Sequence, residues 1–200
     1  MSGPGVSALL LAAGESKRMG RLKPLLPFGD LTVIETILRT LGQCPLAEII
    51  VVLGHRAGEI EPLLKNYPVQ IVHNTRYLRG MLSSIQAGLK AAAGDAQAYL
   101  ICLGDQPRLQ IRTVQLLLGA FAAEPGGIYL PCYLGQGGHP LLLDTRYRDE
   151  VRALDPVIGL RQLLRRHPDQ VRHVGVAAPE VLEDLDTPEE YRLALGHSIR

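Results

Sequence analysis

A chain of 200 residues with 46% hydrophobic and 20% charged residues has the composition of a globular protein with a sizeable core, which excludes a disordered chain. The net charge of +1 and the dispersed arginines give no reason to expect nucleic acid or a membrane as a partner. No internal repeat or long linker divides the chain, so residues 1–200 are predicted to form a single domain.

The first half of the chain predicts alternating strands and helices. A continuous apolar run at residues 6–11 is typical of a strand buried on both faces of a parallel sheet. Thr32 and Glu35 have the spacing of a capping box, which predicts a helix that ends at Gly42. Further strands are expected at residues 49–53, 69–72 and 98–103, and further helices at 58–65, 81–92 and 111–121.

The second half predicts a change of direction within the sheet. Apolar residues at 128–133 and 141–143 flank the Gly-rich turn 135–138, which indicates an antiparallel excursion over the site. A helix at 159–166, a strand at 171–176 and a last helix from Pro188 complete the chain. The alternation predicts an α/β fold, a Rossmann-like three-layer sandwich with a mainly parallel sheet and ligands at the carboxyl ends of its strands.

The cysteines and the N-terminal segment indicate the cellular setting. Cys44, Cys102 and Cys132 are odd in number and far apart, so neither a disulfide framework nor a zinc site is expected. The apolar run at residues 6–13 is too short to span a bilayer, and no basic segment precedes it. These features predict a cytoplasmic protein with reduced thiols.

The loop after the first strand has the chemistry of a polyphosphate site. Small residues at 12–14 are followed by four cations, Lys17, Arg18, Arg21 and Lys23. Small side chains let backbone amides approach phosphate oxygens, and the cations offset the charge of a triphosphate. The loop lacks the Gly-Lys-Ser/Thr of a Walker loop, and the chain has no G-x-G-x-x-G. The alternative is a basic loop that is merely solvated.

Two aspartates are candidate metal ligands. Asp105 stands directly after a buried strand, between a glycine and a proline turn, where a carboxylate can bind Mg²⁺ that is shared with phosphates. A turn or cap aspartate is an equally good account of this position. Asp186 can supply a second oxygen ligand if the last helix packs beside Asp105, although a solvated acidic turn explains it as well.

Polar residues after the third strand are candidates for contacts with a base or ribose. Asn74 follows that strand, and Gly80 permits close backbone approach. Ser83 and Ser84 fall in the first turn of the next helix, where hydroxyls and free amides can meet a ligand. Helix capping is the competing account for both serines.

Taken together, these motifs resemble those of the molybdenum cofactor nucleotidyltransferases, and most closely those of the cytidylyltransferase branch. The matching motifs, in the same order, are residues 11–20 with Lys23-Pro24, Asn74 with Gly80-Met81 and Ser83-Ser84, then 104–107, 138–140 and 184–189. The resemblance covers nearly the whole chain. It implies the fold of the nucleotide-diphospho-sugar transferase type.

The resemblance also implies a substrate and a set of site residues. A nucleoside triphosphate would be bound by Leu11, Ala12, Ala13, Gly14, Arg18, Lys23, Asn74, Gly80 and Ser84, with Arg18, Lys23 and Asp105 as catalytic residues. Mg²⁺ would be held by Asp105 and Asp186. The implied reaction transfers CMP from CTP to the phosphate of a molybdopterin-type cofactor and releases pyrophosphate. The implied partners are the phosphorylated pterin and a molybdoenzyme that receives it.

Two departures from the family pattern bear on the substrates. The guanylyltransferase relatives have two glycines where this chain has Ala13-Gly14, and a methyl group at Ala13 leaves less room for a purine, so CTP is favoured over GTP. The family's Gly-Asp-x-Gly-x-Arg turn is replaced here by the segment 155–161. An acceptor contact from that segment therefore stays open.

Three alternative functions remain. A cytidylyltransferase that acts on a sugar or polyol phosphate, such as methylerythritol phosphate, has a similar loop, but its usual Pro-Lys order is reversed here in Lys23-Pro24. A nucleotide-binding chaperone would deliver the pterin cofactor without catalysis. A dinucleotide-binding oxidoreductase is disfavoured by the missing glycine fingerprint.

Overall fold

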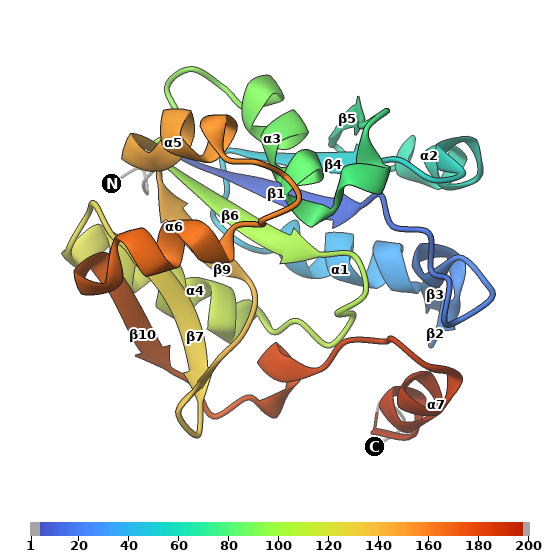
Figure 1. Ribbon diagram of the computed structural model, residues 1–200. Helices are drawn as coiled ribbons and strands as arrows, with labels where there is room; N and C mark the ends of the chain where they lie inside the picture. The colour runs from blue at the N-terminus through green and yellow to red at the C-terminus, as the bar shows by residue number, and fades with distance from the viewer. Residues whose placement is uncertain (1–4, 198–200) are drawn as a thin grey trace.

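The computed structural model describes residues 5–197, in which one eight-stranded sheet separates two layers of helices (Figure 1). Seven strands lie in the order β10-β7-β9-β6-β1-β4-β5, and β8 pairs with β7. Their bounds are β1 Val6–Ala12, β4 Glu48–Leu53, β5 Gln70–His73, β6 Ala98–Leu103, β7 Ile128–Tyr133, β8 Gln136–Gly137, β9 Leu141–Asp144 and β10 Val171–Gly175. A separate pair consists of β2 Pro27–Phe28 and β3 Leu31–Thr32.

The strand β1 lies in the middle of the sheet and pairs in parallel with both β4 and β6. Every residue of β1 is buried, because its side chains alternate between two apolar clusters. Leu10 packs on one face of the sheet, and Leu9 and Leu11 pack on the other. The continuous apolar run of this strand therefore reflects burial on both faces, as predicted.

Helices cover both faces of the sheet, which confirms the predicted three-layer α/β architecture. One layer contains α1 Val33–Leu41, α2 Ala57–Leu64 and α4 Ile111–Ala123, whose apolar faces join one core cluster. The other contains α3 Met81–Ala91, α5 Arg148–Ala153 and α6 Arg161–Arg166. The last helix, α7, spans Pro188–His197. Short 3₁₀ helices are η1 Lys23–Leu25, η2 Tyr77–Arg79, η3 Thr145–Tyr147, η4 Pro168–Gln170 and η5 Pro179–Leu182.

The predicted antiparallel excursion is confirmed, because β9 runs antiparallel to both β6 and β7. The capping box at the start of α1 also forms: the Glu35 carboxylate accepts from the Thr32 amide at 2.9 Å, and the Thr32 hydroxyl accepts from the Glu35 amide at 3.4 Å. The sequence did not predict α5, in which only Val151 is buried among charged neighbours, so the helical period is hidden. Within residues 5–197, no helix combines the length and the apolar character needed to cross a bilayer.

Candidate active site

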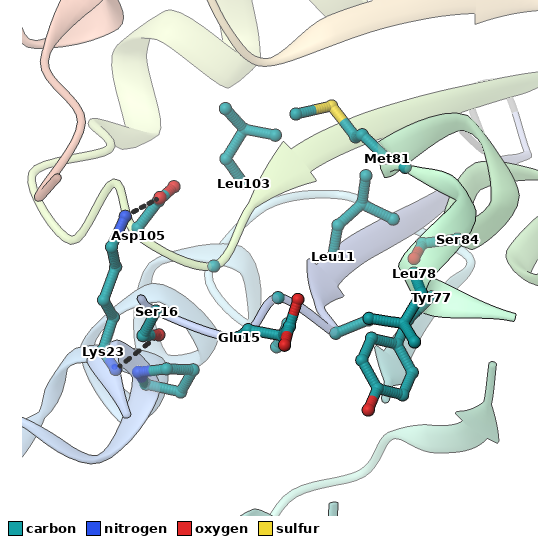
Figure 2. A pocket seen from close by; sticks show the side chains of 16 residues that line it. Leu11, Glu15, Ser16, Lys23, Tyr77, Leu78, Met81, Ser84, Leu103 and Asp105 are labelled. Atoms are coloured by element: carbon teal, nitrogen blue, oxygen red, sulfur yellow. Dashed lines mark hydrogen bonds and ion pairs between the residues drawn. The ribbon is translucent and has the colours of Figure 1, made fainter. Parts of the chain in front are cut away.

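A cleft opens at the carboxyl end of β1, where parallel strands are expected to place ligands (Figure 2). Its cavity has a volume of about 370 Å³. Eight of the predicted site residues line it: Leu11, Ala12, Ala13, Gly14, Lys23, Gly80, Ser84 and Asp105. Segments far apart in the sequence therefore meet around one cavity, as the phosphate-loop prediction requires.

Two glycines outside the predicted set of site residues let the neighbouring strand ends pack closely against the loop that follows β1. Gly54 follows β4, and a Cβ atom there would lie 2.8 Å from the Ala13 carbonyl oxygen. Gly104 follows β6, and a Cβ atom there would lie 2.7 Å from the Leu11 carbonyl oxygen. The Gly104 amide instead donates to that carbonyl at 2.9 Å. The sequence feature that could have indicated these two residues is a glycine directly after each strand that neighbours β1. Only a residue without a Cβ atom lets the backbone come this close to the β1 loop.

Lys23 joins the two candidate metal ligands. Its ammonium donates to Asp105 Oδ2 at 2.9 Å, the contact drawn in Figure 2, and to Asp186 Oδ1 at 2.6 Å. The Lys23 side chain is only 11% exposed, and its backbone amide donates to Ser16 Oγ at 3.1 Å. The acidic turn before α7 thus does pack beside Asp105, which is the condition for Asp186 to act as a second metal ligand.

The charges in this cluster offset one another. Burial disfavours the charged form of Lys23, but Asp105 and Asp186 outweigh it, so the pKa of Lys23 lies above its ordinary value. The hydrogen bond from Lys23 lowers the pKa of Asp186. Arg18 adds to this, with Nη2 at 2.7 Å from Asp186 Oδ2. Two cations and two carboxylates therefore form one compact and nearly neutral group.

Two further titratable groups lie near Asp105. Burial, together with the charge of Asp105, raises the pKa of Asp184, whose Oδ1 accepts from Gln106 Nε2 at 2.9 Å. Burial lowers the pKa of His139, although the charge of Asp105 works in the opposite direction. His139 is therefore uncharged near neutral pH, and Asp184 is more readily protonated than an ordinary aspartate.

The donor set fits a divalent cation that binds together with a nucleotide. Asp105 and Asp186 bring carboxylate oxygens to one ammonium group, and Mg²⁺ is commonly held by one or two carboxylates together with water and phosphate oxygens. Within residues 5–197, no group of three or more His, Cys, Asp or Glu side chains is arranged to hold a metal. The residues present thus suit a shared site rather than a cage made only by the protein.

Asn74 and Arg18 lie outside the wall of the main cavity. Asn74 is buried, and its amide nitrogen donates to Ser83 Oγ at 2.8 Å and Ser84 Oγ at 3.0 Å. It orients Ser84, which does line the cavity. Arg18 is exposed and lines a smaller adjoining cavity of about 260 Å³ that Lys23 and Asp186 share.

The apolar walls of the cavity were not predicted from the sequence. Tyr77, Leu78, Met81 and Leu103 supply them, and Figure 2 shows these side chains around the end of β1. The apolar pattern around Leu103 predicts only that it lies in a strand. The residues of η2 carry no periodic pattern, since this helix has a single turn, so position in the sequence alone could not place them at the site.

The architecture and the site define a nucleotidyltransferase domain: a doubly covered parallel sheet whose first strand ends in a small-residue loop beside a lysine and paired carboxylates. Comparison with known proteins agrees. The family model described as MobA-like NTP transferase domain matches residues 8–171. The chain belongs to this family, which confirms the resemblance to the molybdenum cofactor nucleotidyltransferases.

The relatives have different activities. The chain is 35% identical to nicotine blue oxidoreductase from Paenarthrobacter nicotinovorans, over 95% of this chain and 97% of the relative. It is 28% identical to molybdenum cofactor cytidylyltransferase from Escherichia coli, over 93% of each chain. The crystal structure of Rv0371c from Mycobacterium tuberculosis has a TM-score of 0.84 at 28% identity, covering 98% of this chain and all of that one. The same mycobacterial protein has also been solved in complex with manganese, with a TM-score of 0.79 at 27% identity, covering 96% of this chain and 98% of that one.

Proposed function

We propose that this protein transfers CMP from CTP to the phosphate of a molybdopterin-type cofactor and releases pyrophosphate. The observation that carries the proposal is Lys23, which bridges Asp105 and Asp186 at the edge of the cavity formed by the β1 loop. A molybdenum cofactor cytidylyltransferase among the relatives supports the choice of nucleotide and acceptor. The Ala13 methyl group in the cavity wall supports CTP over GTP, because a purine needs more room.

The cations of the site would bind the triphosphate. Arg18 and Lys23 are already paired with carboxylates, so phosphate oxygens would replace those carboxylates as partners. Asp105 and Asp186 would then be free to hold Mg²⁺, which when bound supplies further positive charge at the phosphates. The mycobacterial relative has been solved in complex with manganese, which supports the binding of a divalent cation by this chain.

The reaction needs alignment more than proton transfer. An anionic oxygen of the acceptor phosphate forms a bond to the α-phosphorus. The bond from that phosphorus to the oxygen that bridges the α- and β-phosphorus atoms breaks, and pyrophosphate leaves with the electron pair. Since the attacking oxygen is already anionic, neither a general base nor a covalent nucleophile is required. Arg18, Lys23 and the loop amides would orient two mutually repelling anions and stabilise the charge that develops.

The first test is the Asp105→Ala variant. We expect turnover to fall by about 100-fold or more, while nucleotide affinity changes much less, because Asp105 would act on charge that develops during transfer. Pyrophosphate release with CTP and molybdopterin gives turnover, and isothermal titration with CTP gives affinity. Asp169→Ala, an exposed aspartate in η4, is the matched control. Equal loss of turnover and affinity would instead mean that Asp105 acts only in nucleotide binding, and a wild-type protein that binds CTP but releases no pyrophosphate would be a nucleotide-binding chaperone.

The relative named as an oxidoreductase favours a second candidate function. In that case the cavity would hold a nicotinamide nucleotide, and the protein would reduce an organic dye. Oxidation of NADPH in the presence of nicotine blue, followed by absorbance, separates the two functions. If the protein releases pyrophosphate from CTP and does not oxidise NADPH, the oxidoreductase function is excluded and the transferase function is supported.

The setting and partners belong to the same proposal. Cys44, Cys102 and Cys132 are free thiols, which supports a reducing, cytoplasmic location. A molybdoenzyme that accepts the finished cofactor is the expected protein partner. A pull-down from a cell extract that contains such enzymes would detect it.

A further inference from the structure

A second cavity lies outside the candidate active site, between α3 and β5 at the edge of the sheet (Figure 1). Its volume is about 450 Å³, and none of the described residues that line it also lines the cavity at the β1 loop. A cavity of this size can hold a small molecule. Asn74, which the sequence motifs assign to the nucleotide, lines this second cavity instead.

The lining of the second cavity carries positive charge without negative charge. Three permanent cations line it, Arg76, Arg79 and Lys90, whereas none of the described residues that line it is an aspartate or a glutamate. Within residues 5–197, neither the Arg76 guanidinium nor the Lys90 ammonium forms an ion pair. The whole chain has a net charge of only +1, so this cavity gathers cations that lack a partner in the protein.

Two carboxylates approach the cavity from outside its lining. Asp155 lies 3.6 Å from the Arg79 guanidinium, and both side chains are about half exposed. Glu61 lies 3.6 Å from His73 Nε2, again with both side chains exposed. Ion pairs of this kind contribute little in water, so a phosphate with shorter, charge-assisted hydrogen bonds can replace them.

The sequence of α3 builds one wall of this cavity. The apolar face of α3 is buried in one of the two core clusters. A second face, with spacings of three and four residues, lines the cavity and consists of Ser83, Gln86, Ala87 and Lys90. The small side chains of Ser83 and Ala87 leave room along the middle of this face.

Hydrogen bonds fix the backbone that carries Arg76. The Arg76 amide donates to Asn74 Oδ1 at 2.9 Å, and Ser83 Oγ donates to the Arg76 carbonyl at 3.0 Å. Asn74 and Ser83 are both buried. This part of the cavity is therefore held in place by the protein itself, which lowers the entropic cost of binding a ligand.

The three cations stand at opposite ends of α3. Arg76 and Arg79 precede its first residue, Met81, and Lys90 lies in its last turn. At the rise of an α-helix, Met81 and Lys90 are about 14 Å apart along the axis. An elongated ligand with an anionic group at each end can contact both sets of cations, whereas a single phosphate can contact only one.

We propose that the second cavity binds an elongated small molecule that carries a phosphate group at each end. Arg76 and Arg79 bind one phosphate, because guanidinium groups match the spacing of phosphate oxygens, and Lys90 binds the other as a point charge. The inference does not depend on the proposed nucleotidyltransferase function, since the two cavities have separate linings.

The experiment compares two sugars that differ by one phosphate. Glucose 6-phosphate and glucose 1,6-bisphosphate are each titrated into the ¹⁵N-labelled protein, and amide shifts in NMR spectra locate the binding and measure its affinity. The affinity is determined from the amides of residues 72–76 and 86–91, which include residues that line the second cavity. We expect the bisphosphate to bind at least about tenfold more tightly, because it contacts both sets of cations.

The double variant Arg76→Gln/Lys90→Gln removes one cation from each end of the cavity. We expect its preference for the bisphosphate to fall to about twofold or less, with no change in thermal unfolding, because both side chains are exposed and unpaired. Arg112→Gln/Arg165→Gln is the matched control and should keep the preference. It removes the same charge from exposed positions in α4 and α6.

Four outcomes would overturn the inference. If neither sugar phosphate shifts the amides of the second cavity, no ligand of this class binds there. If both bind with equal affinity, the two sets of cations do not act together. A preference that survives in the Arg76→Gln/Lys90→Gln variant places the bisphosphate elsewhere. A preference that is lost in the control variant as well reflects general charge attraction rather than this cavity.

Discussion

At the scale of single residues, Lys23 pairs with the two side chains that are the candidate metal ligands. The sequence motifs assign Lys23 to phosphates and Asp105 and Asp186 to a metal, whereas in this structure the three side chains bind one another. A poorly solvated ammonium or carboxylate without a partner is unfavourable. A lysine that would bind phosphate and two aspartates that would bind a metal ion therefore pair with one another in the free protein. The proposed roles and the observed pairing are compatible, because a bound metal ion and a triphosphate would together replace both sets of partners.

The Lys23→Met variant tests this pairing. Removing the ammonium leaves Asp105 and Asp186 facing each other, so we expect the free energy of unfolding to fall by about 1–3 kcal/mol, less than for a fully buried pair. Mg²⁺ should restore more stability to this variant than to the wild-type protein, because both carboxylates are then available to it. Urea unfolding with and without Mg²⁺ measures both effects.

Lys17→Met is the control for that experiment. Lys17 pairs with Glu15 at 2.9 Å on an exposed part of the same loop, and such pairs contribute about 0.5 kcal/mol. An equal response to Mg²⁺ in the Lys23 variant and the wild-type protein would mean that the two aspartates do not bind the ion.

At the level of whole elements, close contact between neighbouring strand ends shapes the cavity. The Gly104→Ala variant would place a methyl group 2.7 Å from the Leu11 carbonyl oxygen, so β6 and the segment with Asp105 would have to shift. We expect a loss of about 1–3 kcal/mol in the free energy of unfolding. Nucleotide affinity should fall as well, and chemical denaturation and CTP titration measure the two losses.

Gly58→Ala provides the contrast in another element. Gly58 lies in α2, and a methyl group added there would meet no heavy atom within 4 Å beyond the backbone of its own helix. Alanine should therefore stabilise the protein by about 0.5–1 kcal/mol through helix propensity. If both glycine variants were neutral, the close approach at Gly104 would not limit the position of β6.

At the scale of the whole molecule, stability should depend on pH through the cluster that joins the first and last thirds of the chain. Asp186 has a lowered pKa, so its contribution is present above its ordinary value of about 3.9 and is lost as the pH falls through the lowered value. Lys23 has a raised pKa, so its contribution is present below about 10.4 and is lost as the pH rises through the raised value.

A pH series of urea unfolding tests both limits. The wild-type protein should be most stable across the neutral range, and Asp186→Asn should weaken the dependence at the acid end. Asp169→Asn serves as the control, since Asp169 is exposed in η4. If Asp186→Asn unfolds with the same acid dependence as the wild-type protein, the cluster does not contribute to acid stability.

Local sequence patterns determined much of this protein. Apolar runs predicted the buried strands, the Thr32–Glu35 spacing predicted the start of α1, and small residues before a group of cations predicted a loop that does line a cavity. Such patterns can be recognised because the spacing of apolar residues reflects which faces of a helix or strand are buried, and because capping residues mark the ends of helices. The alternation of strands and helices then predicted a mainly parallel sheet with its ligands at the carboxyl ends of the strands.

The tertiary structure alone decided which distant groups touch. It brought Asp186 to Lys23 and turned Asn74 inward onto two serines. Periodicity contains no information about these contacts, because they depend on how loops and short helices pack across the sheet rather than on the burial of any one segment. The sequence alone therefore determined the fold and the position of the small-residue loop at the end of β1, and the packing of the loops decided the pairing of charges and the shape of the cavity.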